Sequence, residues 1–203
     1  MTIFHDLFKQ FLPRIVSSND LHARWLNTLS YLENCGARKI AACEHPTQVK
    51  EEMLKHAAEE FRHAHHLKRQ IEKISTLPME DYALPHLLGG RRSLHYLDWL
   101  DSKTCRYLSR VVGLPKQEIK AAAYLLVTYA IELRAAELYP MYEEVLRATG
   151  SKVTVKSILL EEEEHLREME AGLLQLAHGK VHAEYVCALE QELCQEWLGR
   201  LLS

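Results

Sequence analysis

The sequence predicts an all-α fold, and three observations support this prediction. Apolar residues recur at alternating steps of three and four over long stretches, the spacing that keeps side chains on one face of a helix. Eight glycines and six prolines in 203 residues are too few for a turn-rich β fold. An apolar content of 47% is enough to bury a substantial core, and one domain covering residues 1–203 is expected.

The helices can be placed in order from these patterns and from signals at their ends. The expected helices cover residues 3–15, 18–43, 48–75, 93–112, 115–150 and 151–179, with a last helix running to the C-terminus. Ser17 or Ser18 is a suitable N-cap, and Gly150 is a typical helix end. Residues 76–114 form a long connection between the second and third of the four longest helices, and this connection contains one helix of its own.

The first predicted helix has one strongly apolar face. That face consists of Ile3, Phe4, Leu7, Phe8, Phe11, Leu12 and Ile15. It can bind a membrane or a partner protein, or it can pack onto the other helices. A membrane-surface helix usually carries many basic residues on its opposite face, and this segment has few. We therefore expect it to pack onto the other helices.

Two Glu-x-x-His motifs interrupt helical faces that are otherwise apolar. Glu60 and His63 stand in an apolar stripe that begins at Met53, and Glu162 and His165 occupy the equivalent place in the fourth long helix. Side chains three residues apart project from one side of a helix, so each motif directs a carboxylate and an imidazole into the core. Each motif therefore has the outline of a metal-ligand pair.

A single glutamate on an apolar stripe lies one helix before each motif. Glu33 precedes Glu60 by 27 residues, and Glu132 precedes Glu162 by 30 residues. The chain is therefore a loose internal repeat. Each half is a helical hairpin that offers Glu and then Glu-x-x-His.

Energetic magnitudes favour bound metal over a simple buried polar cluster. In the alternative reading, these side chains pair with Arg38, Arg62, Arg134 or Arg167. Moving a carboxylate into a dry interior costs several kcal/mol, whereas a whole domain is stable by only about 5–15 kcal/mol. Two divalent ions balance the charge of four carboxylates, and neutral imidazoles complete the ligand set. Oxygen-rich ligation with a minority of nitrogen suits iron or manganese better than zinc.

The motifs resemble the metal-binding segments of the ferritin-like di-iron carboxylate superfamily, which includes bacterioferritins and rubrerythrins. In that superfamily two helices each supply one Glu, and two others each supply Glu-x-x-His. The similar segments are Ala-Glu-Glu-Phe-Arg-His-Ala at 58–64, Ala-Ile-Glu-Leu at 130–133 and Ile-Leu-Leu-Glu-Glu-Glu-Glu-His at 158–165. The resemblance covers about residues 18–180. It implies a four-helix bundle with a long helical crossover at 76–114 and extra N- and C-terminal helices.

The resemblance also implies a cofactor and a ligand set. The cofactor is a pair of iron ions, with an iron–manganese or a manganese pair as alternatives. The implied metal ligands are Glu33, Glu60, His63, Glu132, Glu162 and His165. In these proteins the reduced metal pair reacts with dioxygen, and the surrounding protein decides which molecule is oxidised.

His56 is a further residue that can reach the same metal pair. It lies four residues before Glu60, on the same helix face. Arylamine N-oxygenases of the superfamily are similar in carrying a third histidine four residues before a Glu-x-x-His, although there it lies on the last bundle helix. In the alternative reading His56 bonds a backbone carbonyl or Glu59 at the edge of the bundle.

Three more residues near the motifs have individual expectations. Tyr129 lies about one turn from Glu132, and as the candidate catalytic residue it can donate a hydrogen bond to a ligand or carry a radical; a buried tyrosine with a satisfied hydroxyl is the alternative. Glu59 is an alternative to Glu60 as a ligand, but it lies about 100° from the ligand face and is expected to face solvent. Glu137 is an alternative to Glu132, but it lies off the apolar stripe and is expected to pair with an arginine.

Charge and cysteine content limit the partners. A net charge of −3 argues against binding of nucleic acid or an anionic membrane through bulk charge. No stretch has transmembrane length or resembles a signal peptide. Five cysteines without a Cys-x-x-Cys indicate free thiols and a cytoplasmic location, without the iron module that rubrerythrins use for electron entry. We expect a monomer or a homodimer.

Three functions are compatible with these patterns. The first is an oxidase or oxygenase that uses dioxygen on a small organic substrate; the crossover and the terminal helices can cover a substrate pocket. The second is a ferroxidase, iron-handling or peroxide-defence protein, as in bacterioferritin or rubrerythrin. The third is a metal-free helical interaction module. We rank the oxygenase first, and the sequence identifies neither its organic substrate nor its electron donor.

Overall fold

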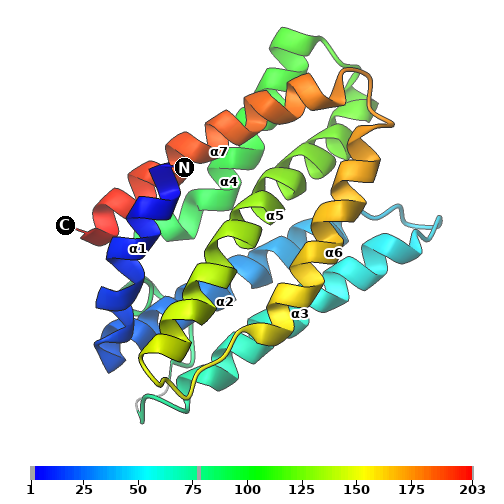
Figure 1. Cartoon of the computed structure of the whole chain (residues 1–203). Coiled ribbons are helices and arrows are strands. Elements are labelled where there is room, and N and C mark those ends of the chain that lie inside the picture. Colours follow the sequence, from blue (N-terminus) through cyan, green and yellow to red (C-terminus); the bar gives the residue numbers. More distant parts are fainter. Residues whose placement is uncertain (1–2, 77–78, 203) are drawn as a thin grey trace.

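The computed structural model describes residues 3–76 and 79–202, and all regular structure within these residues is helical (Figure 1). The elements are α1 (Ile3–Val16), α2 (Asn19–Cys43), α3 (Glu51–Ile71), the 3-10 turn η1 (Leu84–His86), α4 (Arg91–Tyr107), the π-helical turn η2 (Leu108–Val112), α5 (Lys116–Ala148), α6 (Lys156–Leu173) and α7 (Gly179–Leu202). The all-α prediction is confirmed for this part of the chain. None of its helices is long and apolar enough to cross a membrane.

Two helical hairpins form the centre of the molecule. α2 packs along α3, and α5 packs along α6; contacts of α2 with α5 and of α3 with α6 join the two hairpins (Figure 1). Each of the four helices contributes a fully buried aliphatic residue to one common core. These residues are Leu26, Leu67, Leu126 and Ile158.

The remaining helices α1, α4 and α7 all contact α5, and α4 also packs along α7 (Figure 1). α4 lies in the connection between the two hairpins, where the sequence predicts a helix. In α1 the apolar face is buried, including Phe8, Phe11 and Leu12, which confirms the expectation that this helix packs onto the others. The side chains of Ile3 and Phe4 lie outside the described part of the chain.

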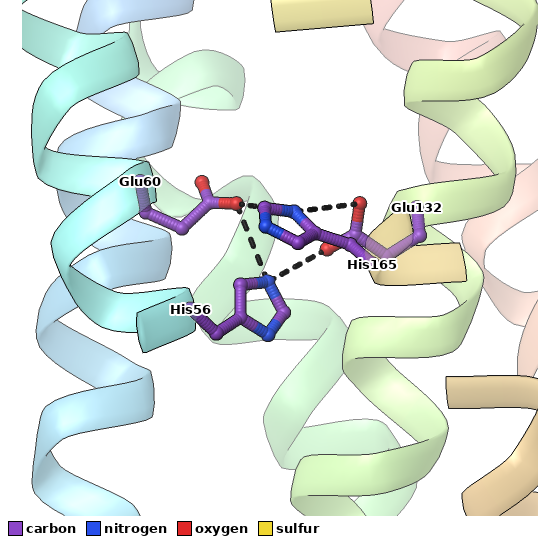
Figure 2. Close-up of side chains that lie close together, drawn as sticks. All are labelled: His56, Glu60, Glu132 and His165. Carbon is purple, nitrogen blue, oxygen red and sulfur yellow. Dashed lines mark hydrogen bonds and ion pairs between the residues drawn. The ribbon is translucent and has the colours of Figure 1, made fainter. Parts of the chain in front are cut away.

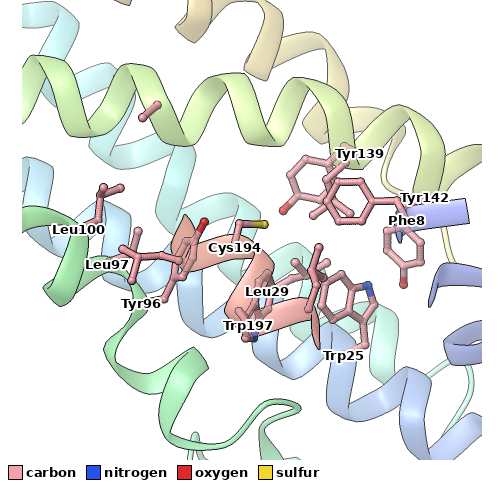
Figure 3. Packing of buried hydrophobic residues seen from close by; sticks show 14 of the residues in the cluster. Phe8, Trp25, Leu29, Tyr96, Leu97, Leu100, Tyr139, Tyr142, Cys194 and Trp197 are labelled. Carbon is pink, nitrogen blue, oxygen red and sulfur yellow. The ribbon is translucent and has the colours of Figure 1, made fainter. Parts of the chain in front are cut away.

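Aromatic side chains fix α4 and α7 against α2 (Figure 3). The rings of Trp25 and Trp197 are stacked with their centroids 5.6 Å apart. Phe11 meets Trp25 edge-on at 5.0 Å, and Tyr96 lies 5.4 Å from Trp197. Because aromatic contacts of this kind bury large areas, they anchor the additional helices to the hairpins.

The fourth long helix begins later than predicted. α6 starts at Lys156 instead of Ser151, because Glu143 holds the preceding segment in a non-helical conformation. The carboxylate of Glu143 accepts a hydrogen bond from the backbone N–H of Val155 at 2.9 Å and another from the hydroxyl of Thr154 at 3.2 Å. A local sequence pattern cannot reveal a buried side chain that reaches back from the previous helix.

Both ends of α3 and the connection between α6 and α7 also differ from the prediction. α3 covers Glu51–Ile71 instead of 48–75, because the residues that follow Ile71 form turns. Gly179 begins α7, whereas the prediction placed it at the end of the previous helix. That helix ends at Leu173, and the link to α7 contains His178 in the left-handed region with φ 54°.

Candidate metal centre

The structure brings the six predicted ligands and His56 together in two groups. The first group is Glu33, Glu60, His63 and Glu162, and the second is His56, Glu60, Glu132 and His165. Within each group, one potential ligand atom of every side chain lies within 4.8 Å of those of the others. Glu60 belongs to both groups. The two groups therefore adjoin and share one carboxylate.

Helical spacing explains this convergence. α3 carries His56, Glu60 and His63 at steps of four and three, so all three side chains project from one face of that helix. α6 carries Glu162 and His165 in the same way, while α2 and α5 contribute one glutamate each. Glu33 is half-buried and the other six side chains are buried. The apolar stripes that pack the hairpins together thus carry the polar side chains inward with them.

The second group lies at the centre of Figure 2. His56 Nε2 lies 3.1 Å from Glu132 Oε1 and 3.4 Å from Glu60 Oε1. His165 Nδ1 lies 3.4 Å from the same oxygen of Glu60. The rings of His56 and His165 approach to 4.0 Å between centroids. Two imidazoles and two carboxylates therefore surround one point.

The first group has one imidazole and three carboxylates. His63 Nδ1 lies 3.1 Å from Glu162 Oε1 and 3.9 Å from Glu33 Oε2. Glu33 also accepts a hydrogen bond from the hydroxyl of Tyr139, which is fully buried. The sequence pattern did not indicate this contact, although Tyr139 lies two turns after Glu132.

Two further glutamates contact the ring nitrogens of the ligand histidines that point away from the groups. Nε2 of His165 lies 2.8 Å from Glu59, and Nε2 of His63 lies 2.6 Å from Glu161. The expectation that Glu59 faces solvent is wrong, because this carboxylate reaches across to α6. A histidine that binds a metal commonly donates its other ring N–H to a carboxylate, which fixes the ring orientation. The repeated sequence Glu-Glu-x-x-His contained this signal in both motifs.

Three of the four carboxylates, those of Glu33, Glu132 and Glu162, are costly to ionise without a cation. Burial raises the pKa of Glu132 to about 8. Burial, followed by repulsion from neighbouring carboxylates, raises the pKa of Glu33 and of Glu162 well above the usual range. Burial acts in the same direction on Glu60, but hydrogen bonds with His165 and His56 outweigh it and hold the pKa of Glu60 well below its usual range. A bound cation would favour the ionised form of all four carboxylates.

Several buried atoms of these groups have no hydrogen-bond partner among the described residues. They are Nδ1 of His56, His63 and His165, Oε2 of Glu132 and Oε1 of Glu162. Apart from the His56 atom, they face one another; His165 Nδ1, for example, lies 3.9 Å from Glu132 Oε2. Buried polar atoms are nearly always satisfied, and an unobserved ion is one explanation for a cluster that is not. The residues present therefore fit a pair of bound cations.

The arginines named as alternative partners bond elsewhere. Arg62 pairs with Glu161 at 2.7 Å, and Arg134 pairs with Glu137 at 2.6 Å and with Glu190 at 2.7 Å. The expected pairing of Glu137 with an arginine is confirmed.

Tyr129 belongs to neither group. Burial raises its pKa, and the nearest charged influences come from Cys187 and Glu170. No hydrogen bond within the described residues joins Tyr129 to Glu132, so its catalytic role stays a prediction. The tyrosine that contacts a grouped carboxylate is Tyr139.

A cavity of about 570 Å³ adjoins the two groups. Its wall includes Glu33, Glu60 and Glu132, and the rest of its lining is mainly apolar. α4 and α7 contribute Leu97 and Trp197 to this wall. A space of this size is typical of a small-molecule site.

No family model, no curated protein and no solved structure matches this chain. The functional interpretation therefore rests on the geometry of the two groups and on the sequence motifs. All five cysteines are free, as expected from their spacing.

Proposed function

We propose that this protein is a di-iron carboxylate protein of the ferritin-like type, with α2, α3, α5 and α6 as its four-helix bundle and the whole chain as one domain. The observation that carries this proposal is the pair of buried groups that share Glu60, in which ligand atoms without a hydrogen bond lie opposite one another at 3.1–3.9 Å. Glu33, His63 and Glu162 would hold one ion, and Glu132, His165 and His56 the other, with Glu60 between them. The oxygen-rich ligand set suits iron, and an iron–manganese or manganese pair is compatible with it.

When bound in the reduced state, such a metal pair supplies electrons for the reduction of dioxygen. The residues of the chain have separate tasks. The four carboxylates balance the charge of two divalent ions, and Glu59 and Glu161 keep the Nδ1 atoms of the two ligand histidines directed at them. Burial of the groups lowers the local dielectric constant, which strengthens the electrostatic interactions between these side chains and a bound ion.

We further propose that the oxidised substrate is a small organic molecule. The cavity beside Glu33, Glu60 and Glu132 supports this choice over iron storage, because a ferroxidase site needs no large apolar chamber. Part of the chamber wall comes from α4 and α7, two of the three helices outside the hairpins. The substrate would lie against the metal-facing carboxylates inside this chamber.

Metal analysis followed by exposure to oxygen tests this proposal. Protein loaded anaerobically with ferrous iron should retain two ions per chain, and His63→Ala and His165→Ala should each lose mainly one. On addition of dioxygen the protein should oxidise about two irons per chain and then stop without a reducing partner. It should remain a monomer or a small oligomer.

Other outcomes would favour the alternatives. Continued oxidation of many ferrous ions into a mineral, with formation of large particles, would favour the iron-handling function. Unchanged metal content in the double His63→Ala/His165→Ala variant would rule out these residues as ligands. Protein that binds no metal under any condition would favour a helical interaction module.

A further inference from the structure

The cavity beside the metal groups extends along α5. The α5 residues that line it recur at helical spacing from Lys116 through Lys120, Tyr124 and Thr128 to Tyr139. At about 1.5 Å per residue, this stretch extends roughly 34 Å along the helix. On α2 the lining runs from Leu29 to Cys43. A compact ligand would fill only part of such a space, whereas a linear ligand can follow it.

One end of the cavity is closed and apolar. Leu29, Leu138, Tyr139, Tyr96 and Trp197 line this end, and all five are buried. The ring of Trp197 stacks on Trp25 and is fixed in place by a hydrogen bond from its Nε1 to Ser93 at 2.8 Å. This end can accommodate the tail of an apolar chain.

The other end is open and positively charged. Lys116 and Lys120 are exposed at the cavity rim and, among the described residues, form no ion pair. Lys39 and Asp101 also line this end, and Lys39 pairs with Asp98 at 3.0 Å and with Asp101 at 3.5 Å. Two lysine ammonium groups therefore remain available to an anionic group that enters from solvent.

The metal-facing carboxylates lie between these two ends. Glu132 stands on α5 between Thr128 and Ala135, both of which line the cavity, and Glu33 and Glu60 line the same wall. An extended chain that reaches from the lysines to the closed end must pass these three carboxylates. The middle of such a chain, and not its charged end, would then lie beside the metal groups.

We infer that the cavity binds a long-chain fatty acid, with its carboxylate at Lys116 and Lys120 and its alkyl chain directed along α5 past the metal groups. This inference deepens the proposed function, because it names the class of the organic substrate. The length of the cavity selects a linear molecule, its apolar lining selects an alkyl chain, and its unpaired lysines select a carboxylate. Apolar burial supplies the affinity, while the charge fixes the direction of entry.

Direct binding of tetradecanoate to the full-length protein tests this inference. Isothermal titration should give one molecule per chain in both the metal-free and the manganese-loaded protein. 1-Tetradecanol, which has the same chain without the charge, should bind about tenfold more weakly. Quenching of tryptophan fluorescence provides a second readout, because Trp197 lines the closed end.

Charge reversal at the cavity rim separates the contribution of the fatty-acid carboxylate to the affinity from that of the alkyl chain. Lys116→Glu/Lys120→Glu should lower the affinity for tetradecanoate by about tenfold or more and leave that for 1-tetradecanol within about twofold. Lys152→Glu/Lys156→Glu is the matched control, since both residues are exposed, lie outside the cavity lining and give the same change in net charge. Equal effects of the two double variants would contradict a specific carboxylate site.

A substitution that blocks the cavity tests the path of the alkyl chain. Ala135 lines the cavity, whereas its neighbour Ala136 is also half-buried but does not. Ala135→Phe should abolish binding of both tetradecanoate and 1-tetradecanol, and Ala136→Phe should not. Circular dichroism checks that both variants fold. If one of them does not fold, the comparison of Lys116→Glu/Lys120→Glu with its control is the test of the inference.

The outcomes distinguish this inference from the proposed function. Protein that holds two metal ions but binds no tetradecanoate would overturn the fatty-acid inference and leave the metal centre intact. Protein that binds tetradecanoate but no metal would overturn the proposed function and leave the binding site. Equal affinity for tetradecanoate and 1-tetradecanol, unaffected by the rim variants, would also overturn the inference.

Discussion

The α2–α3 and α5–α6 hairpins supply the same ligand types in the same order, yet they differ at two equivalent positions. His56 lies four residues before Glu60 on α3, and the residue four before Glu162 on α6 is Ile158. Tyr139 lies seven residues after Glu132 on α5, and the residue seven after Glu33 on α2 is Ile40. Both isoleucines are buried.

This difference gives the two metal groups unequal surroundings. His56 adds a second imidazole to the group that contains Glu132, while Tyr139 donates a hydrogen bond to Glu33 in the other group. The two hairpins share the Glu and Glu-x-x-His ligands, and each has one polar side chain, His56 or Tyr139, where the other has an isoleucine. A more nitrogen-rich site and a more carboxylate-rich site are expected to differ in metal affinity and preference.

The largest expected effect comes from the carboxylate that the two groups share. Glu60→Gln should reduce the metal content from two ions per chain to nearly none, because both groups lose a charged ligand. Glu33→Gln and Glu132→Gln should each remove mainly one ion, since each glutamate belongs to a single group. Metal analysis after anaerobic loading and desalting measures the difference. Retention of one ion by Glu60→Gln would show that the groups do not share this residue.

An intermediate effect is expected when α3 is made to match α6. His56→Ile should lower the affinity of the Glu132 group by about tenfold or more and leave the other group unchanged. Stepwise titration with cobalt, followed by its visible spectrum, can separate the two sites. His65→Ala is the control, because His65 is exposed on the same helix.

The His56 prediction has a clear contrary outcome. Nε2 of His56 lies within 3.4 Å of two carboxylate oxygens, so either a proton or a metal ion must occupy the space between these atoms. If the cobalt spectrum and both affinities are the same in His56→Ile as in the wild type, a proton and not a metal ion lies between His56 and the carboxylates. His56 would then support Glu60 and Glu132 by hydrogen bonding alone.

The sequence could predict the helices and the members of the two groups because both follow from helical periodicity. A polar residue within an apolar stripe must project into the core, and this places Glu60, Glu132 and Glu162 in the interior, where the structure has them. Within residues 3–76 and 79–202 the structure confirms an all-α fold that brings the seven side chains together. Metal binding and the ferritin-like topology stay proposals.

Features that depend on contacts between distant segments could not be predicted. Glu59 lies off the ligand face of its own helix, but it reaches His165 because α6 passes close to α3 at that point. Glu143 delays the start of α6 through a contact with a loop. Tyr139 lies two turns after Glu132, but its hydrogen-bond partner is Glu33 on another helix, which the spacing along α5 does not reveal. Local spacing contains no information on which helices become neighbours.

The smallest expected effect concerns the hydroxyl that contacts Glu33. Tyr139→Phe should leave two ions bound but lower the free energy of unfolding of the metal-free protein by about 1–2 kcal/mol, because a buried carboxyl oxygen loses its hydrogen bond. Urea denaturation measures this change. Tyr129→Phe is the matched control: Tyr129 lies on the same helix without a hydrogen bond to either group among the described residues, so its loss should cost less than about 0.5 kcal/mol. Equal losses of unfolding free energy in the two variants would show that Tyr139 contributes by packing and not by its hydrogen bond. A loss of metal in Tyr129→Phe alone would support the role at the metal centre that the sequence predicts for Tyr129.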